Sequence, residues 1–143
     1  MTKRIQELIA ESVEFPQDSQ RDNELVALLK IEDTSVALEI IKDMARRRSP
    51  NTLHVAGRVL TYRKVAEPFF LFALENVDAS SIRLLLEFAL PRIGLRTTIL
   101  CLKSREVEDP EILDKALYWL PNLVKEKDLN IIEELRKTRE ITD

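Results

Sequence analysis

Residues 109–120 read Asp-Pro-Glu-Ile-Leu-Asp-Lys-Ala-Leu-Tyr-Trp-Leu, and this stretch carries the pattern that decides the fold. Its apolar residues at offsets +4, +7, +8 and +11 from Asp109 mark one face of an α-helix. Counted from Asp18, Ser49, Asp78 and Asp109, fourteen of the sixteen such positions are apolar, against about seven for a chain that is 45% hydrophobic. The intervals of 31, 29 and 31 residues predict consecutive helical hairpins.

This period divides the chain into an N-terminal helix over residues 2–12 and four hairpins. The first runs over about 20–48, the second opens at residue 49, and the third and fourth run over about 78–104 and 109–140. Helix-capping residues and prolines set the expected helix starts. We expect one helix after Asp33-Thr34-Ser35, one at Ser49-Pro50, one at Pro68 and one at Asp109-Pro110. Pro91 and Pro121 follow their anchors by 13 and 12 residues, which predicts a shared bend or helix end.

The composition predicts a single all-α domain over residues 1–143. Only two Gly and six Pro are present, and helix-favouring residues dominate. The N-terminus lacks the apolar core of a signal peptide, and no run of 18 apolar residues could span a membrane, so we expect a cytoplasmic protein.

The expected architecture is an α-solenoid of about four hairpins plus the N-terminal helix, and an ordinary closed helical bundle is the alternative. Either packing buries the apolar stripes. The predicted core comprises Leu25, Leu29, Ile40, Ile41, Leu60, Phe70, Leu74, Ile82, Leu86, Ile99, Leu102, Leu113, Leu117 and Ile132.

Two stretches resemble short HEAT-like repeats, the kind also found in phycobilisome lyases. Residues 109–120 are similar to the first helix of such a unit, and residues 64–75, Lys-Val-Ala-Glu-Pro-Phe-Phe-Leu-Phe-Ala-Leu-Glu, to the second. The chain departs from the family in its scarcity of glycine, with only Gly57 and Gly94, and in the bulk of residues 69–72. The resemblance implies a right-handed solenoid that binds other macromolecules.

The sequence shows no pattern of catalytic or metal-ligating residues. His54 is the only histidine and Cys101 the only cysteine, so a two-histidine zinc site and an intramolecular disulfide are both excluded. We interpret His54 as a structural or partly exposed residue and Cys101 as a small core residue. We therefore predict no catalytic residue, metal or cofactor.

The charge is distributed unevenly. Residues 42–64 carry seven basic residues against one acidic, a net +6, and residues 78–105 carry five against two, a net +3, whereas the whole chain is −3. Such polarity steers acidic partners. The predicted partner-binding residues are Arg46, Arg47, Arg48, Arg58, Arg63, Lys64, Arg92 and Arg96.

The hairpin interpretation places four of these residues at equivalent turns. Arg63 and Lys64 fall inside the second hairpin, and Arg92 and Arg96 inside the third, so a solenoid would align them in a basic ridge. A solvated surface is the alternative. The triplet Arg46–Arg48 has a structural explanation, because cations are favoured at a helix C-terminus.

Three functions follow as hypotheses. The first is a scaffold that binds an acidic protein partner or a second copy of itself, with Tyr62, Tyr118 and Trp119 as candidate anchors. The second is nucleic-acid binding along the basic ridge, which the pI near 5.4 disfavours. The third is a bilin-lyase-like enzyme, which only the family resemblance favours.

Overall fold

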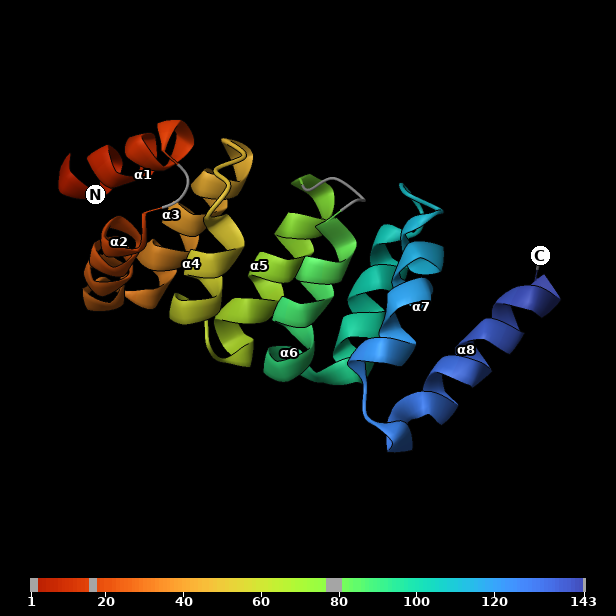
Figure 1. Cartoon of the computed structure of the whole chain (residues 1–143). Helices are drawn as coiled ribbons and strands as arrows, with labels where there is room; N and C mark the ends of the chain where they lie inside the picture. The colour runs from red at the N-terminus through yellow and green to blue at the C-terminus, as the bar shows by residue number, and fades with distance from the viewer. Residues whose placement is uncertain (1–2, 16–17, 77–80, 143) are drawn as a thin grey trace. The chain divides into compact units, whose positions relative to one another are not determined.

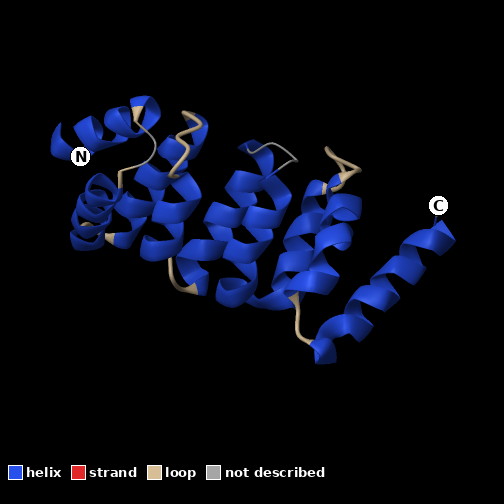
Figure 2. Ribbon diagram, viewed as in Figure 1, coloured by secondary structure: helices blue, strands red, loops and turns tan. Residues whose placement is uncertain are grey.

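A computed structural model describes residues 3–15, 18–76 and 81–142, and within these ranges every regular element is a helix (Figures 1 and 2). The chain divides into two compact units, Met1–Val77 and Asp78–Asp143. The all-α prediction is thus confirmed for the described residues. The first unit holds α1 (Lys3–Glu14), α2 (Ser19–Ile31), α3 (Thr34–Arg46), α4 (Thr52–Val59) and α5 (Arg63–Asn76). The second holds α6 (Ile82–Arg105), α7 (Ile112–Leu123), the 3-10 turn η2 (Glu126–Asp128) and α8 (Leu129–Thr142).

Side-chain caps confirm two of the predicted helix starts. Asp18 precedes α2 and accepts a hydrogen bond from the backbone N–H of Arg21 at 3.1 Å. Asp33 precedes α3 and accepts one from the N–H of Ser35 at 3.4 Å. Each carboxylate satisfies a donor that has no partner within its helix, which fixes where the helix begins.

Three predicted helix starts are wrong. α4 begins at Thr52, because the hydroxyl of Ser49 takes part in buried hydrogen bonds instead of capping a helix. α5 begins at Arg63 and includes Pro68, so this proline interrupts only the hydrogen bonding of the early turns. α7 begins at Ile112, whose N–H donates to the carbonyl of Asp109 across a turn at 3.2 Å. The third anchor, Asp78, lies outside the described residues.

In the first unit, α2 and α3 each pack on a neighbouring helix and on the next helix but one along the chain. α2 contacts α1 and α4, and α3 contacts α4 and α5. Phe69 and Phe70 of α5 are both completely buried in this core. The first helices of the first two hairpins therefore lie against each other, and so do their second helices.

An exposed ion pair joins α1 to α2. Arg4 Nε lies 2.7 Å from Glu24 Oε1, and Arg4 Nη2 lies 2.8 Å from Glu24 Oε2, which is the two-pronged geometry that arginine favours. Hydrogen bonding to Arg4 lowers the pKa of the Glu24 carboxyl, and the same bond raises the pKa of Arg4. Because both side chains are exposed, the pair orients α1 more than it stabilises the unit.

In the second unit, α6 reverses direction at Gly94 (Figure 1). Gly94 has φ 81° and ψ 165°, a conformation that is open essentially to glycine alone. The α6 element therefore consists of the two helices predicted for the third hairpin. Pro91 stands three residues before this turn, and Pro121 lies in the last turn of α7, which confirms that both prolines mark helix ends.

All fourteen residues of the predicted core are buried, with exposed fractions of 7% or less. Two other apolar residues are exposed. Val13 near the end of α1 is 54% exposed, and Val36 in the first turn of α3 is 39% exposed. Both lie near a helix end, where no neighbouring helix covers them.

Candidate functional site

The predicted basic residues of the first unit are mostly engaged in contacts within it. Arg46 at the end of α3 lies over the ring of Phe72 in α5, with its guanidinium carbon 4.8 Å from the ring centre. Lys42 Nζ lies 5.6 Å from the centre of the same ring. The electron-rich face of the ring attracts both cations, so these two side chains help to hold α3 on α5.

The triplet that ends α3 has a backbone function. Arg47 is the C-cap, and Arg48 follows with a positive φ of 55°. The N–H of Arg48 donates to the carbonyl of Ala45, and the N–H of Ser49 to that of Met44, each at 3.0 Å. These bonds form a Schellman motif, in which glycine usually occupies the position of Arg48. The structural explanation of the triplet as a helix end is confirmed.

The other predicted cations of the first unit differ in their surroundings. Arg47 pairs with Asp43 one turn back at 3.0 Å. Arg58 Nη1 donates to the side-chain oxygen of Asn23 at 2.6 Å, which links α4 to α2. Arg63 and Lys64 are exposed in the first turn of α5.

In the second unit, Arg92 and Arg96 have different environments although only four positions separate them in the sequence. The guanidinium carbon of Arg92 lies 4.6 Å from the ring centre of Phe88, and its Nη1 donates to the Phe88 carbonyl at 2.8 Å. Burial lowers the pKa of Arg92. Arg96 is exposed and lines a groove. The basic ridge, which would join residues of both units, stays a prediction.

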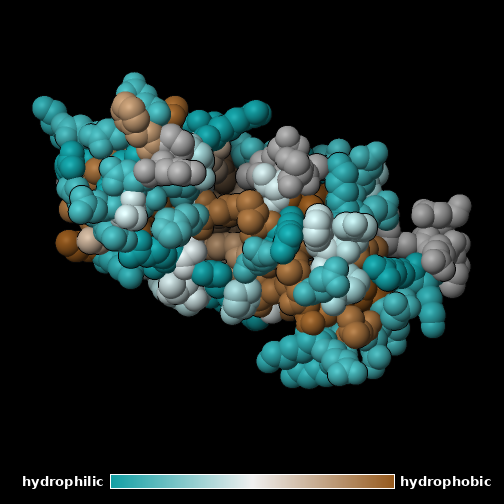
Figure 3. Space-filling view, viewed as in Figure 1, coloured by the Kyte–Doolittle hydropathy of each residue, from teal (hydrophilic) through white to brown (hydrophobic). Residues whose placement is uncertain are grey.

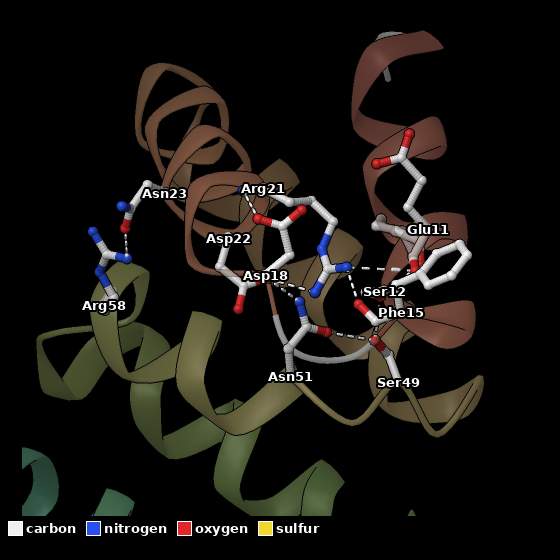
Figure 4. Close-up of polar contacts among 11 residues, drawn as sticks. Glu11, Ser12, Phe15, Asp18, Arg21, Asp22, Asn23, Ser49, Asn51 and Arg58 are labelled. Carbon is white, nitrogen blue, oxygen red and sulfur yellow. Dashed lines mark hydrogen bonds and ion pairs between the residues drawn. The ribbon is translucent and has the colours of Figure 1, made fainter.

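A buried polar cluster connects α1, α2 and the turn before α4 in the first unit. It comprises Ser12, Arg21, Asp22, Ser49 and Asn51, all of which are at most 7% exposed. Figure 4 shows the Arg21 guanidinium directed at the end of α1, where it donates to the carbonyls of Phe15 and Glu11. Arg21 therefore caps the Phe15 carbonyl just beyond α1, and it is a second donor to the Glu11 carbonyl, which also accepts from the backbone N–H of Phe15 at 2.8 Å.

The remaining members of the buried polar cluster form a chain of hydrogen bonds (Figure 4). Asp22 Oδ1 lies 3.3 Å from Arg21 Nη2 and accepts from Asn51 Nδ2 at 2.7 Å. Ser49 Oγ donates to Asn51 Oδ1 at 2.6 Å and lies 2.8 Å from Ser12 Oγ. The sequence signal for this cluster was Asp22 itself, because the equivalent position is apolar in the other three hairpins, where it is Leu53, Ile82 and Leu113. These contacts make the cluster structural.

An exposed aromatic surface lies on α6 and α7 of the second unit. We use this name for Arg83, Leu84, Tyr118 and Trp119. The Arg83 guanidinium carbon lies 5.2 Å from the centre of the Trp119 ring, and the Tyr118 and Trp119 rings meet edge to face at 5.0 Å. Tyr118 is 70% exposed and Leu84 54% exposed.

Sequence reasoning found half of this surface. Tyr118 and Trp119 were candidate anchors, whereas Arg83 and Leu84 were not. In the sequence, Arg83 was counted only as one of the basic residues of 78–105. Its contact with Trp119 could not be predicted from local spacing, because the two residues are 36 positions apart. The third candidate anchor, Tyr62, precedes α5 and is 45% exposed.

The two residues considered for chemistry belong to different units. His54 is exposed on α4, and Cys101 is buried in α6 and forms no disulfide. Among the described residues, no three His, Cys, Asp or Glu side chains come close enough together to hold a metal ion. None of the helices in the described ranges combines the length and apolar character that a membrane span needs.

Comparisons with family models, with curated proteins and with solved structures find no match to this chain.

Proposed function

We propose that this chain is an α-helical repeat scaffold that binds a protein partner, and that the aromatic surface of the second unit is its main contact. The observation that carries this proposal is the ordered stack of Arg83, Trp119 and Tyr118 on an exposed face. Tryptophan, tyrosine and arginine are the residues that most often dominate the binding energy of protein interfaces.

The geometry supports this use of the aromatic surface. Arg83 lies between the Trp119 ring and Glu87, to which its Nε donates at 3.1 Å. Its side chain is thus ordered before any partner arrives, which reduces the entropy lost on binding. Tyr118 and Leu84 then offer apolar area that a partner can cover.

We further propose that the hairpins form a HEAT-like solenoid. The packing of α2 on α4 and of α3 on α5 supports this, because equivalent helices of adjacent hairpins stack in solenoids. Small-angle X-ray scattering tests the proposal. A compact 143-residue globule has a radius of gyration of about 14–15 Å, and a solenoid should exceed it clearly.

Co-purification from the source cells tests the binding function. We expect the double variant Tyr118→Ser/Leu84→Ser to lose a partner that the wild type retains. Tyr62→Ser is the matched control, because it removes an exposed tyrosine from the first unit. Normal helical content and equal partner recovery in the double variant would contradict the proposed surface. Recovery of nucleic acid in place of protein would support the second hypothesis.

A further inference from the structure

A second surface of the C-terminal unit is an open groove between α6 and α8. It has a volume of about 390 Å³ and is lined by Arg96, Ile99, Leu100, Lys103, Ile131, Glu134, Leu135 and Thr138. Figure 1 shows α8 diverging from α7 along its length, and Figure 3 shows hydrophobic residues at the surface beside the connection between these helices. We call this feature the α6–α8 groove.

The floor of the α6–α8 groove is apolar. Leu100 is 66% exposed, whereas Ile99 and Leu135 beside it are 7% and 8% exposed. A leucine this exposed, next to a buried apolar layer, gives an incoming apolar side chain a surface to cover.

The α6 wall of the groove carries two cations in a regular arrangement. Arg96 and Lys103 are seven residues apart on one helix, which is two turns or about 10.5 Å, and Leu100 lies between them. Within the described part of the chain, neither cation is in an ion pair, in contrast to Arg105, which lies 3.7 Å from Glu108. Among the lining residues of α8 that the structure describes, one carries a carboxylate, namely Glu134.

We propose that the α6–α8 groove binds one amphipathic helix of a protein partner, whose apolar face covers Leu100 and whose edge carries two carboxylates two turns apart. A helix fits because residues at i and i+7 repeat the spacing of Arg96 and Lys103. Charge complementarity sets the orientation, with the acidic edge on α6 and the opposite edge on Glu134. This inference depends on the proposed protein-binding function and names the chemistry of the partner.

A pair of synthetic peptides tests the proposal against the full chain. Both form amphipathic helices with one leucine face. One carries two glutamates two turns apart beside that face, and the other carries lysines at the same positions. Fluorescence anisotropy at low salt should show the glutamate peptide binding about five- to tenfold more tightly, and salt should reduce the difference.

Charge reversal in the groove provides the decisive variant. Arg96→Glu/Lys103→Glu should invert the preference between the two peptides. Lys125→Glu/Lys127→Glu is the matched control, since it makes the same change in net charge elsewhere in the same unit, and it should preserve the preference. Leu100→Asp should abolish binding of both peptides while circular dichroism shows an unchanged fold.

Several results would overturn the groove proposal. These are equal affinity for the two peptides, no binding of either, an equal effect of the control pair, or tighter binding of a single-stranded oligonucleotide than of the glutamate peptide. If any of them occurs while co-purification still depends on Tyr118, the groove assignment fails and the scaffold function stands. If the glutamate peptide is not preferred and co-purification does not depend on Tyr118 either, the proposed scaffold function fails as well.

Discussion

The two units differ in what their arginines contact. In the first unit Arg21 is buried against the end of α1, Arg46 lies on Phe72 and Arg58 bonds to Asn23, so cations join helices to one another. In the second unit Arg83 lies over the ring of the partly buried Trp119, and Arg96 lines an open groove. The most basic stretch of the sequence, residues 42–64, lies in the first unit, yet the surfaces that we propose for binding lie in the second. Local charge therefore identifies a binding site only after the internal contacts are known.

The largest effect should come from removing the buried cation of the first unit. Arg21→Met deletes the donor to the Glu11 and Phe15 carbonyls and leaves Asp22 buried without its cation. We expect a loss of about 3 kcal/mol in the free energy of unfolding. Urea denaturation measures it, and amide exchange should localise the loss to α1 and α2. Arg58→Met is the control and should cost less than about 1 kcal/mol. Equal losses in the two variants would contradict the structural role of the buried polar cluster.

Replacing each of the two glycines by alanine sharpens the comparison between the units, because the two variants should change the free energy of unfolding in opposite directions. Gly94→Ala in the second unit forces a β-carbon into a strained conformation and should cost about 1–3 kcal/mol. Gly57 lies inside α4 with a negative φ, so Gly57→Ala should stabilise the first unit by about 0.5–1 kcal/mol. Thermal unfolding of both variants checks this. A neutral Gly94→Ala would show that α6 does not reverse there.

Arg48 offers a gain of stability in the first unit. Its positive φ closes α3 in a conformation that suits glycine, and its side chain is exposed. Arg48→Gly should therefore raise the free energy of unfolding by about 1 kcal/mol. Arg47→Gly is the matched change at the preceding residue, which has helical backbone angles, and it should destabilise instead. Chemical denaturation of both variants measures the difference, and a loss of stability in Arg48→Gly would argue against the Schellman motif.

The smallest effect concerns the exposed pair between α1 and α2. The pKa of Glu24 is lowered in the folded state, so its contribution to stability is present above the unfolded pKa and disappears as the pH falls through the folded value. A carboxyl-detected NMR titration should find the Glu24 pKa below its ordinary range, and Arg4→Met should return it there. An unchanged value in the variant would exclude Arg4 as the cause.

Local patterns predicted most of the fold. The 30-residue period located the hairpins, and the capping carboxylates Asp18 and Asp33 marked two helix starts because caps act over three residues. The helix start predicted at Ser49 was wrong for a physical reason. It is a good capping residue by type, but its hydroxyl is drawn into contacts with Asn51 and with Ser12, which is 37 residues away.

The candidate site was less accessible to prediction because it depends on long-range neighbours. Whether Arg46 is available to a partner depends on Phe72, and whether Trp119 is ordered depends on Arg83. Each of these pairs joins different helices, so no local spacing reveals them. The groove residue Arg96 was predicted from its position in the hairpin, whereas Lys103 was counted only as charge.

Site-specific photo-crosslinking tests most directly whether the second unit presents the binding surface. Benzoylphenylalanine replaces Tyr118 in one variant and Tyr62 in another, and both are irradiated in the source cells. We expect a discrete crosslinked protein, either a partner or a second copy of the chain, from position 118 and little or none from position 62. A crosslink from position 62 alone, or equal yields from the two positions, would contradict the assignment of binding to the aromatic surface.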